Sequence, residues 1–123
     1  MKVKRIVPNI ATNDIDAAKR FYCDILGLEI AMDLGWIATF KTDASVNPQL
    51  SVATEGGSDT AVPDVSIEVD DLDEVLSRFR NEQIAIEYGP VTEPWGVRRF
   101  YVRDPSGRLL NILEHACQSA PPP

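Results

Sequence analysis

The chain has 123 residues, enough for one domain with a substantial hydrophobic core, and its 44% hydrophobic and 25% charged residues are typical of a globular protein. Its formal net charge of -7 argues against a nucleic acid partner, because phosphate binding depends on clustered Lys and Arg. No apolar run approaches the roughly 18 residues of a membrane span, and the N-terminus lacks a signal-peptide stretch, so we expect a cytoplasmic protein that does not enter membranes.

An internal repeat organises the chain. A shift of 57 positions places Asn13 to Asp16 on Asp70 to Asp73, and it also aligns Tyr22 with Phe79. In each copy a strand-like run ends in a short acidic turn, and a helical pattern follows. The acidic side chains of the turn can accept hydrogen bonds from the free amides of the first helical turn. The repeat therefore predicts two similar modules in tandem.

The first half predicts a strand, a helix and three further strands. Ile15, Ala18, Tyr22, Ile25 and Leu26 recur at helical spacing. Gly27 follows where a left-handed cap would end the helix. Three strand-like runs come next, at residues 28–33, 36–41 and 49–54.

The second half repeats this order. Leu72, Val75, Leu76 and Phe79 form the apolar stripe of its helix, and strand-like runs follow at residues 85–91, 97–103 and 109–114. The acidic run from Asp70 to Glu74 lacks the glycine and terminal glutamate of a calcium loop, which favours helix capping. Residues 56–61 read as a linker and residues 118–123 as a disordered tail.

Each half thus reads as a βαβββ module. We expect an α+β fold in which two tandem modules, about residues 1–55 and 62–117, form curved, cup-like mixed sheets within a single domain at residues 1–117. A lone module would leave exposed sheet edges, so two must associate. They can pair within the chain or across a dimer, and the sequence leaves both arrangements open.

Motifs in both halves resemble those of the vicinal oxygen chelate superfamily, which includes glyoxalase I, bleomycin-resistance proteins and extradiol dioxygenases. The first-half motif is Phe21-Tyr22, Asp24 and Leu26-Gly27-Leu28. The second-half motifs are residues 94–96, 104–107 and 111–114. The resemblance spans about residues 4–115 and implies the cup-like fold and a homodimer with cups at the shared interface.

Enzymes of this superfamily hold a divalent metal with His, Gln or Glu side chains at four inward positions. The resemblance implies that these positions are Val7, Ser51, Asp64 and Asn111 here. Of these four residues, Asp64 and Asn111 are candidate metal ligands, and both are weak. One carboxylate and one amide are fewer than the three or four donors that retain a transition metal. His115, four residues past Asn111, is expected to be exposed at the chain end rather than a ligand. We therefore expect no metal and no cofactor.

Strand alternation indicates which side chains face the cup. Apolar residues such as Phe100 and Val102 alternate with Arg99 and Tyr101, so one face packs on a helix and the other lines a pocket. Trp36 and Trp95 either stack on a flat ligand or pack within the protein; for Trp95, inside a Pro-Trp-Gly turn, packing is favoured. The candidate ligand-binding residues are Val7, Asn9, Trp36, Ser51, Asp64, Ser66, Glu68, Trp95, Arg99, Tyr101 and Asn111.

Other chemistry has little support. Cys23, within the predicted helix, reads as an inert thiol, and Cys23 and Cys117 are expected to be reduced. A single histidine leaves no Ser-His-Asp set, so no catalytic residue is predicted. Asp64 and Glu68 could act as acid and base, but solvated or salt-bridged carboxylates, for instance with Arg99, are the default.

Three functions remain. The preferred one is a metal-free protein that sequesters a small molecule, aromatic or cationic, as the bleomycin-resistance branch does. The alternative is a metal-dependent lyase, isomerase or dioxygenase of the same fold, with a non-standard site that recruits Asp64, Asn111 and Glu114 or His115. The third is a regulatory or partner-binding module without a pocket.

Overall fold

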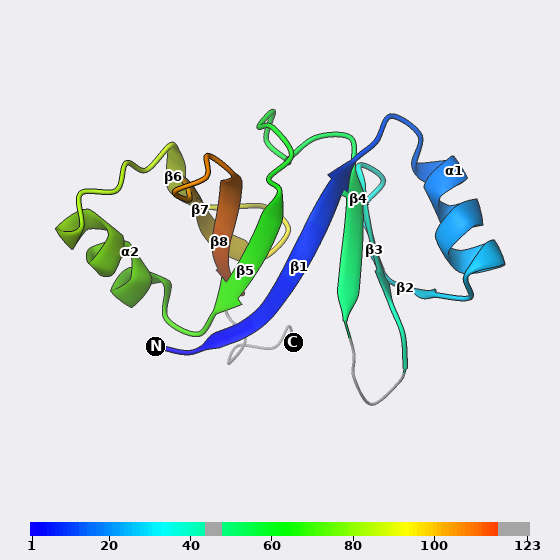
Figure 1. The fold of residues 1–123 in the computed structure, drawn as a ribbon, viewed down its shortest axis with the longest axis horizontal. Helices are drawn as coiled ribbons and strands as arrows, with labels where there is room; N and C mark the ends of the chain where they lie inside the picture. Colours follow the sequence, from blue (N-terminus) through cyan, green and yellow to red (C-terminus); the bar gives the residue numbers. More distant parts are fainter. Residues whose placement is uncertain (44–47, 116–123) are drawn as a thin grey trace. The chain divides into compact units, whose positions relative to one another are not determined.

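The computed structural model describes residues 1–43 and 48–115. Its elements follow the order β-α-β-β-β twice (Figure 1), so the predicted α+β class with two βαβββ modules is confirmed. The predicted tail and Cys117 lie outside the described residues. The elements are β1 (Val3–Ala11), α1 (Ile15–Lys19), η1 (Arg20–Ile25), β2 (Glu29–Asp33), β3 (Ile37–Lys41), β4 (Gln49–Ala53), β5 (Val65–Val69), α2 (Leu72–Asn81), β6 (Tyr88–Thr92), β7 (Val97–Arg103) and β8 (Leu109–His115).

The chain divides into two compact units, which we call the first and second modules. The first module comprises Val7–Asp64, and the second combines residues 1–6 with the chain from Val65 onward, so β1 contributes to both. The strand order of the first is β2-β3-β4-β1, with β1 parallel to β4. The order of the second is β5-β8-β7-β6, with β5 parallel to β8. The two strand orders match, as the sequence repeat requires.

Both helices begin at the predicted acidic turns. The Asp14 carboxylate accepts a hydrogen bond from the backbone N–H of Ala17, and Asp71 accepts one from Glu74. The first helix differs from its prediction, because α1 passes into the wider π-helix η1 instead of remaining α-helical. It is followed by Gly27 with a φ of +77°, the left-handed conformation expected there.

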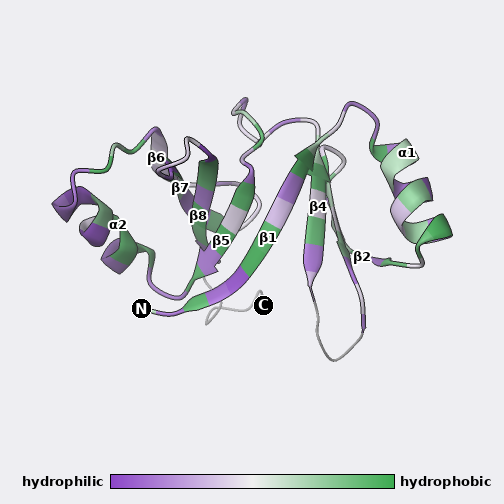
Figure 2. Ribbon diagram, in the orientation of Figure 1, coloured by the Kyte–Doolittle hydropathy of each residue, from purple (hydrophilic) through white to green (hydrophobic). Residues whose placement is uncertain are grey.

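The helices cover their sheets unequally. Figure 2 shows hydrophobic and hydrophilic residues alternating along the strands. Each sheet therefore has one apolar face, against which its helix packs. In the second module, α2 buries three residues in a core that also contains Phe100 and Ile112. In the first module neither α1 nor η1 contains a buried residue, and the core consists of Ala38, Phe40 and Val52. The first module is therefore the less tightly packed of the two.

Among the described residues, no helix combines the length and the apolar character that crossing a membrane requires.

Candidate functional site

One face of the second module's sheet carries five of the eleven predicted binding residues. On β7, Phe100 packs in the helix-side core while Arg99 and Tyr101 point to the other face, as alternation predicts. Strand pairing then places Ser66, Asn111 and Tyr101 in one row across β5, β8 and β7. We call the face of Ser66, Glu68, Arg99, Tyr101 and Asn111 the second-module polar face.

Asn111 has an incomplete set of hydrogen bonds. Its Nδ2 donates to the hydroxyl of Ser66 at 3.1 Å across the β5–β8 pair. Its Oδ1 is buried and has no hydrogen-bond partner among the described residues. A buried acceptor without a partner costs about 1–3 kcal/mol. This oxygen can accept a hydrogen bond from a ligand or an ordered water.

Arg99 forms a buried ion pair with a residue that the sequence did not single out. Its Nε donates to Glu93 Oε2 at 2.8 Å, and each side chain is 3% exposed. The same carboxylate oxygen accepts a hydrogen bond from the Tyr88 hydroxyl at 2.7 Å, and Arg99 Nη1 donates to the Tyr101 hydroxyl at 3.0 Å. Arg99 and Glu93 are therefore fixed and mutually neutralised.

Aromatic rings surround this guanidinium. The Cζ atom of Arg99 lies 5.4 Å from the ring centroid of Tyr88 and 5.0 Å from those of Trp95 and Tyr101. These distances are within the range of cation–π attraction. Trp95 thus lies against the protein's own cation, so a ligand cation would have to compete with Arg99 for these rings.

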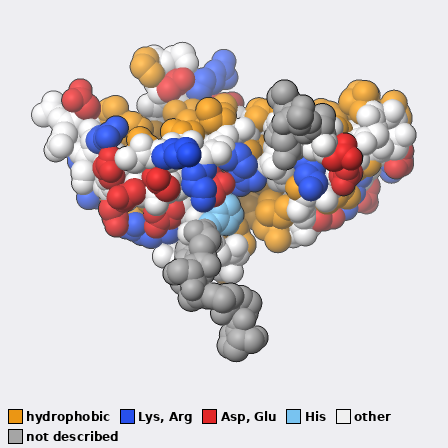
Figure 3. Space-filling model, turned by 90° about the horizontal axis from the view of Figure 1, so that it is seen from below, with side chains coloured by type: hydrophobic (Ala, Val, Ile, Leu, Met, Phe, Trp, Pro, Cys, Tyr) orange, Lys and Arg blue, Asp and Glu red, His pale blue; other side chains and the backbone are white. Residues whose placement is uncertain are grey.

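Glu68 is the centre of a second charged network on this face. Its carboxylate contacts Arg5 Nε at 3.0 Å, Lys4 Nζ at 3.7 Å and His115 Nδ1 at 2.8 Å. Figure 3 shows the pale blue histidine beside Lys and Arg side chains. Burial raises the pKa of Glu68, but the hydrogen bond and charge of His115 and the charges of Arg5 and Lys4 outweigh it, so the pKa lies below its usual value.

Two details of the sequence interpretation need correction. Glu68 is salt-bridged as expected, but its partners are Arg5, Lys4 and His115 and not the suggested Arg99, which pairs with Glu93. His115 is 41% exposed, as expected of a strand end, yet its ring is also held by Glu68. Glu93 and Tyr88 were missed because only strand pairing reveals them: Tyr88 faces Tyr101, and Glu93 lies in the β6–β7 turn.

The first module carries its own polar row on the face opposite its helix. Pairing aligns Asn9 with Ser51 and Ser51 with Thr39, and the Ser51 and Thr39 hydroxyls lie 2.7 Å apart and are buried. Val7 is buried on β1. The carbonyl oxygen of Asp64 accepts a hydrogen bond from the N–H of Asn9 at 2.9 Å. Trp36 lies immediately before β3 and is half-buried.

The residues at the four metal-ligand positions do not fit a transition metal. Val7 has no donor atom, and the Ser51 hydroxyl already bonds with Thr39. The Asn111 amide donates to Ser66, which leaves a neutral carbonyl oxygen, and Asp64 is the single carboxylate of the set. Within residues 1–43 and 48–115, no group of three or more His, Cys, Asp or Glu side chains could hold a metal ion.

Glu114, which the enzyme alternative recruits, is engaged elsewhere. Its Oε1 accepts a hydrogen bond from the backbone N–H of Leu72 at 2.8 Å, at the start of α2, and its Oε2 lies 3.9 Å from Arg98. Arg98 also pairs with Asp73 of α2. Glu114 therefore caps the helix on the face opposite Asn111.

Solved structures with the same fold support this architecture. A structure described as an NAD-dependent benzaldehyde dehydrogenase from Legionella pneumophila matches with a TM-score of 0.74 at 17% identity, covering 89% of this chain and 98% of that one. A glyoxalase/bleomycin resistance protein/dioxygenase superfamily member from Vibrio splendidus matches with a TM-score of 0.64 at 21% identity, covering 92% and 99%. Methylmalonyl-CoA epimerase from Mycobacterium tuberculosis matches with a TM-score of 0.63 at 18% identity, covering 96% and 90%.

Sequence comparison gives the family. A comparison with curated proteins finds no match. The sequence profile of the glyoxalase-like domain matches residues 5–116, which is nearly the entire chain. The match agrees with the two βαβββ modules and with the resemblance found in the motifs of both halves. The chain belongs to the glyoxalase-like domain family.

Proposed function

We propose that this protein binds a small organic molecule at the second-module polar face without a resident transition metal. The observation that carries the proposal is the Asn111 amide. It occupies the last-strand position at which the superfamily's enzymes carry an acidic ligand, and its buried Oδ1 has no partner among the described residues. A neutral amide oxygen is a weak metal ligand but a good acceptor for an N–H or O–H group.

The surroundings of Asn111 favour a planar, uncharged or weakly polar ligand. Tyr101, beside Asn111 in the strand pairing, places a buried aromatic ring at this face, and Arg99 is already neutralised by Glu93. Cation–π sites for a positive ligand are taken by Arg99. Of the two ligand types that the sequence suggested, we therefore favour the aromatic one at this face. In this proposal the protein acts by lowering the free concentration of its ligand, and no reaction is required.

A second candidate, an acid–base enzyme of the same fold, is favoured by the pair of Glu68 and His115. The carboxylate oxygen lies 2.8 Å from His115 Nδ1, an arrangement that orients an imidazole so that Nε2 can accept or release a proton. Glu68 also contacts Arg5 and Lys4, so the pair equally serves to join three strands. We rank this candidate second because the structural role accounts for every contact of Glu68.

The first test measures metal directly. Protein purified without a histidine tag is analysed by inductively coupled plasma mass spectrometry, and its melting temperature is followed with Zn, Ni, Mn and Fe(II). We expect substoichiometric metal and no stabilisation by any of the four ions. Stoichiometric metal, or a clear rise in melting temperature with one ion, would overturn the metal-free proposal.

The second test measures the hydrogen bond to Asn111. Benzamide, which offers N–H donors, is compared with N,N-dimethylbenzamide, which offers none, in ligand-observed NMR titrations. We expect benzamide to bind more tightly, and we expect Asn111→Ala to weaken benzamide binding about tenfold while leaving the dimethyl analogue unchanged. Asn81→Ala, an exposed asparagine at the end of α2, is the matched control. Equal binding of both compounds, or equal effects of both variants, would contradict the proposal.

A further inference from the structure

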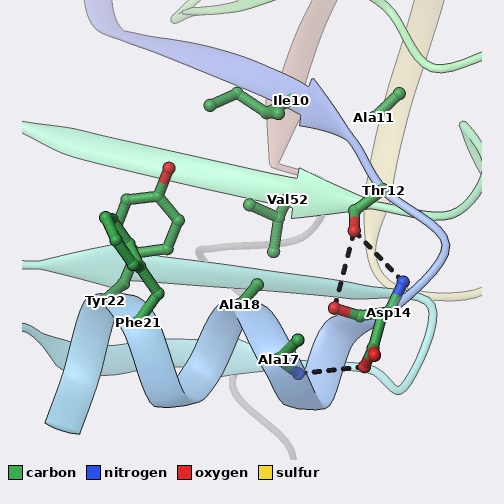
Figure 4. Close-up of a pocket in the computed structure, with 9 residues that line it drawn as sticks. All are labelled: Ile10, Ala11, Thr12, Asp14, Ala17, Ala18, Phe21, Tyr22 and Val52. Atoms are coloured by element: carbon green, nitrogen blue, oxygen red, sulfur yellow. Dashed lines mark hydrogen bonds between the residues drawn. The ribbon is translucent and has the colours of Figure 1, made fainter. Parts of the chain in front are cut away.

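A separate hollow lies in the first module, between the helix and its sheet. Its volume is about 310 Å³, near the lower end of ligand pockets, which span roughly 300–1,000 Å³. Figure 4 shows Asp14 and Thr12 at one end of the hollow and Phe21 and Tyr22 at the other. The lining residues are Ile10, Ala11, Thr12, Asp14, Ala17, Ala18, Phe21, Tyr22 and Val52.

The hollow is on the opposite side of the first module's sheet from its polar row. Val52 belongs to the helix-side core, while its neighbour Ser51 bonds with Thr39 on the other face. Ile10 pairs with Val52 across β1 and β4, and both line the hollow. This site is therefore distinct from every residue set that the proposed function uses.

The sequence repeat explains why the hollow exists. The row Ile10, Val52 and Ala38 in the first module corresponds to Ile67, Ile112 and Phe100 in the second. In the first module alanine thus occupies the place of a buried phenylalanine, and valine that of an isoleucine.

The helix facing this row also has a smaller residue at one lining position. In the 57-residue repeat, Ala18, which lines the hollow, corresponds to Val75, which is buried in the second-module core. Close-packed interiors do not tolerate such a loss of volume without a void. Ala18 and Val52 line the hollow, whereas Ala38 is fully buried and does not.

The hollow has one charged end. Asp14 Oδ1 accepts the capping hydrogen bond from Ala17, and Oδ2 has no hydrogen-bond or ion-pair partner among residues 1–43 and 48–115. Of the described residues that line the hollow, Asp14 is the single charged one. The first module itself contains nine Asp and Glu against three Lys and Arg, a formal charge of -6. The negative electrostatic potential at the Asp14 end of the hollow therefore favours binding of a cation.

The apolar end is accessible from solvent. Phe21 is 50% exposed and Ile10 is 45% exposed, although both are large hydrophobic residues. A ligand seated between them would remove this apolar surface from water, at roughly 25 cal/mol per Å². An occupant thus needs an apolar ring and a positive group on a short tether.

We propose that this hollow binds a small aromatic primary amine. The ring lies between Ile10, Val52 and Tyr22, and the ammonium group donates to the Asp14 carboxylate. Charge complementarity selects the amine over neutral or anionic aromatic compounds, which share the apolar contacts but not the ion pair.

The test uses three probes of similar shape and different charge on the full chain. 2-Phenylethylamine, 2-phenylethanol and 3-phenylpropionate are titrated separately into ¹⁵N-labelled protein, and amide shifts are followed by NMR. We expect the amine to shift residues of the hollow and to bind about three- to fivefold more tightly than the alcohol, the upper range of an exposed ion pair, because Asp14 is exposed. The carboxylate is expected to bind more weakly than both.

Variants separate the charge from the volume. Asp14→Asn retains the capping oxygen and removes the charge, so the amine should lose its advantage over the alcohol while the fold is unchanged. Asp59→Asn removes one charge from the same module outside the hollow and should have no effect. The double variant Ala18→Val with Val52→Ile installs the second module's residues and should weaken all aromatic probes.

Four outcomes would overturn the proposal: no shifts in the hollow at millimolar amine, equal binding of the three probes, equal effects of the two Asp variants, or unchanged binding in the double variant. The charge series on the unmodified protein decides the question even if a variant fails to fold. Because the site shares no residue with the second-module polar face, failure here leaves the proposed function intact.

Discussion

The carboxylate of Glu93 and the guanidinium of Arg99 form an ion pair with an Nε–Oε2 distance of 2.8 Å, and each side chain is 3% exposed. Tyr88 and Tyr101 complete the hydrogen bonds of this pair. A turn residue and a strand residue are thereby joined within the β6–β7 hairpin. The pair fixes the hairpin that carries the aromatic part of the second-module polar face.

Removing one partner of this pair should be strongly destabilising. Glu93→Ala leaves Arg99 charged and buried, and we expect the free energy of unfolding to fall by about 3–5 kcal/mol. Urea denaturation followed by circular dichroism measures it. The double variant Glu93→Leu with Arg99→Met removes both charges and should be more stable than Glu93→Ala. A loss below about 1 kcal/mol in the single variant would show that the pair is far more hydrated than its burial indicates.

The ionised Glu68 carboxylate should stabilise the folded protein at neutral pH, and this contribution should be lost in acid. Its pKa is lowered in the folded protein, so its stabilisation is fully present above the unfolded pKa of about 4.3 and is lost as pH falls through the lower folded value. Glu68→Gln should therefore lose less stability than the wild type between about pH 5 and pH 3. The free energy of unfolding is measured across this range. Parallel curves for the two proteins would contradict a lowered pKa.

Gly89 should not tolerate a side chain. Its φ is +78°, and a Cβ there would lie 2.5 Å from the backbone oxygen of Arg99 and 3.1 Å from the nitrogen of Val91. Gly89→Ala therefore combines an unfavourable φ with a backbone clash, and we expect a loss of about 2–4 kcal/mol in the free energy of unfolding. Gly35→Ala is the control, because Gly35 has a φ of +89° and nothing within 4 Å of the added Cβ. Equal losses in both variants would exclude the clash.

The Asp71 cap offers a prediction for α2. Its carboxylate accepts a hydrogen bond from the Glu74 N–H at 3.1 Å. Asp71→Ala should lower the free energy of unfolding by about 1 kcal/mol, whereas Asp71→Asn, which keeps a capping oxygen, should cost only a few tenths. Thermal and urea denaturation measure both. An equal loss in the two variants would indicate that the charge, and not the hydrogen bond, is the important feature.

Part of the candidate site followed from strand alternation. Because successive side chains point to opposite faces, the placement of Arg99 and Tyr101 opposite Phe100 required only the recognition of a strand. The partners of these residues could not be inferred in the same way. Glu93 meets Arg99 through the β6–β7 turn, and the register there contains an irregularity between Tyr88 and Val91 that no local pattern encodes.

The sequence by itself determined the two βαβββ modules, the capping residues Asp14 and Asp71, and the family. These features depend on periodicity and on interactions between residues close along the chain. Both are visible in each copy of the sequence repeat. Tertiary structure alone decided the ion-pair partners of Arg99 and Glu68, the unpartnered oxygen of Asn111 and the hollow beside Ala18. Those features depend on strand register and on packing volume, and both are set by contacts between residues distant in sequence.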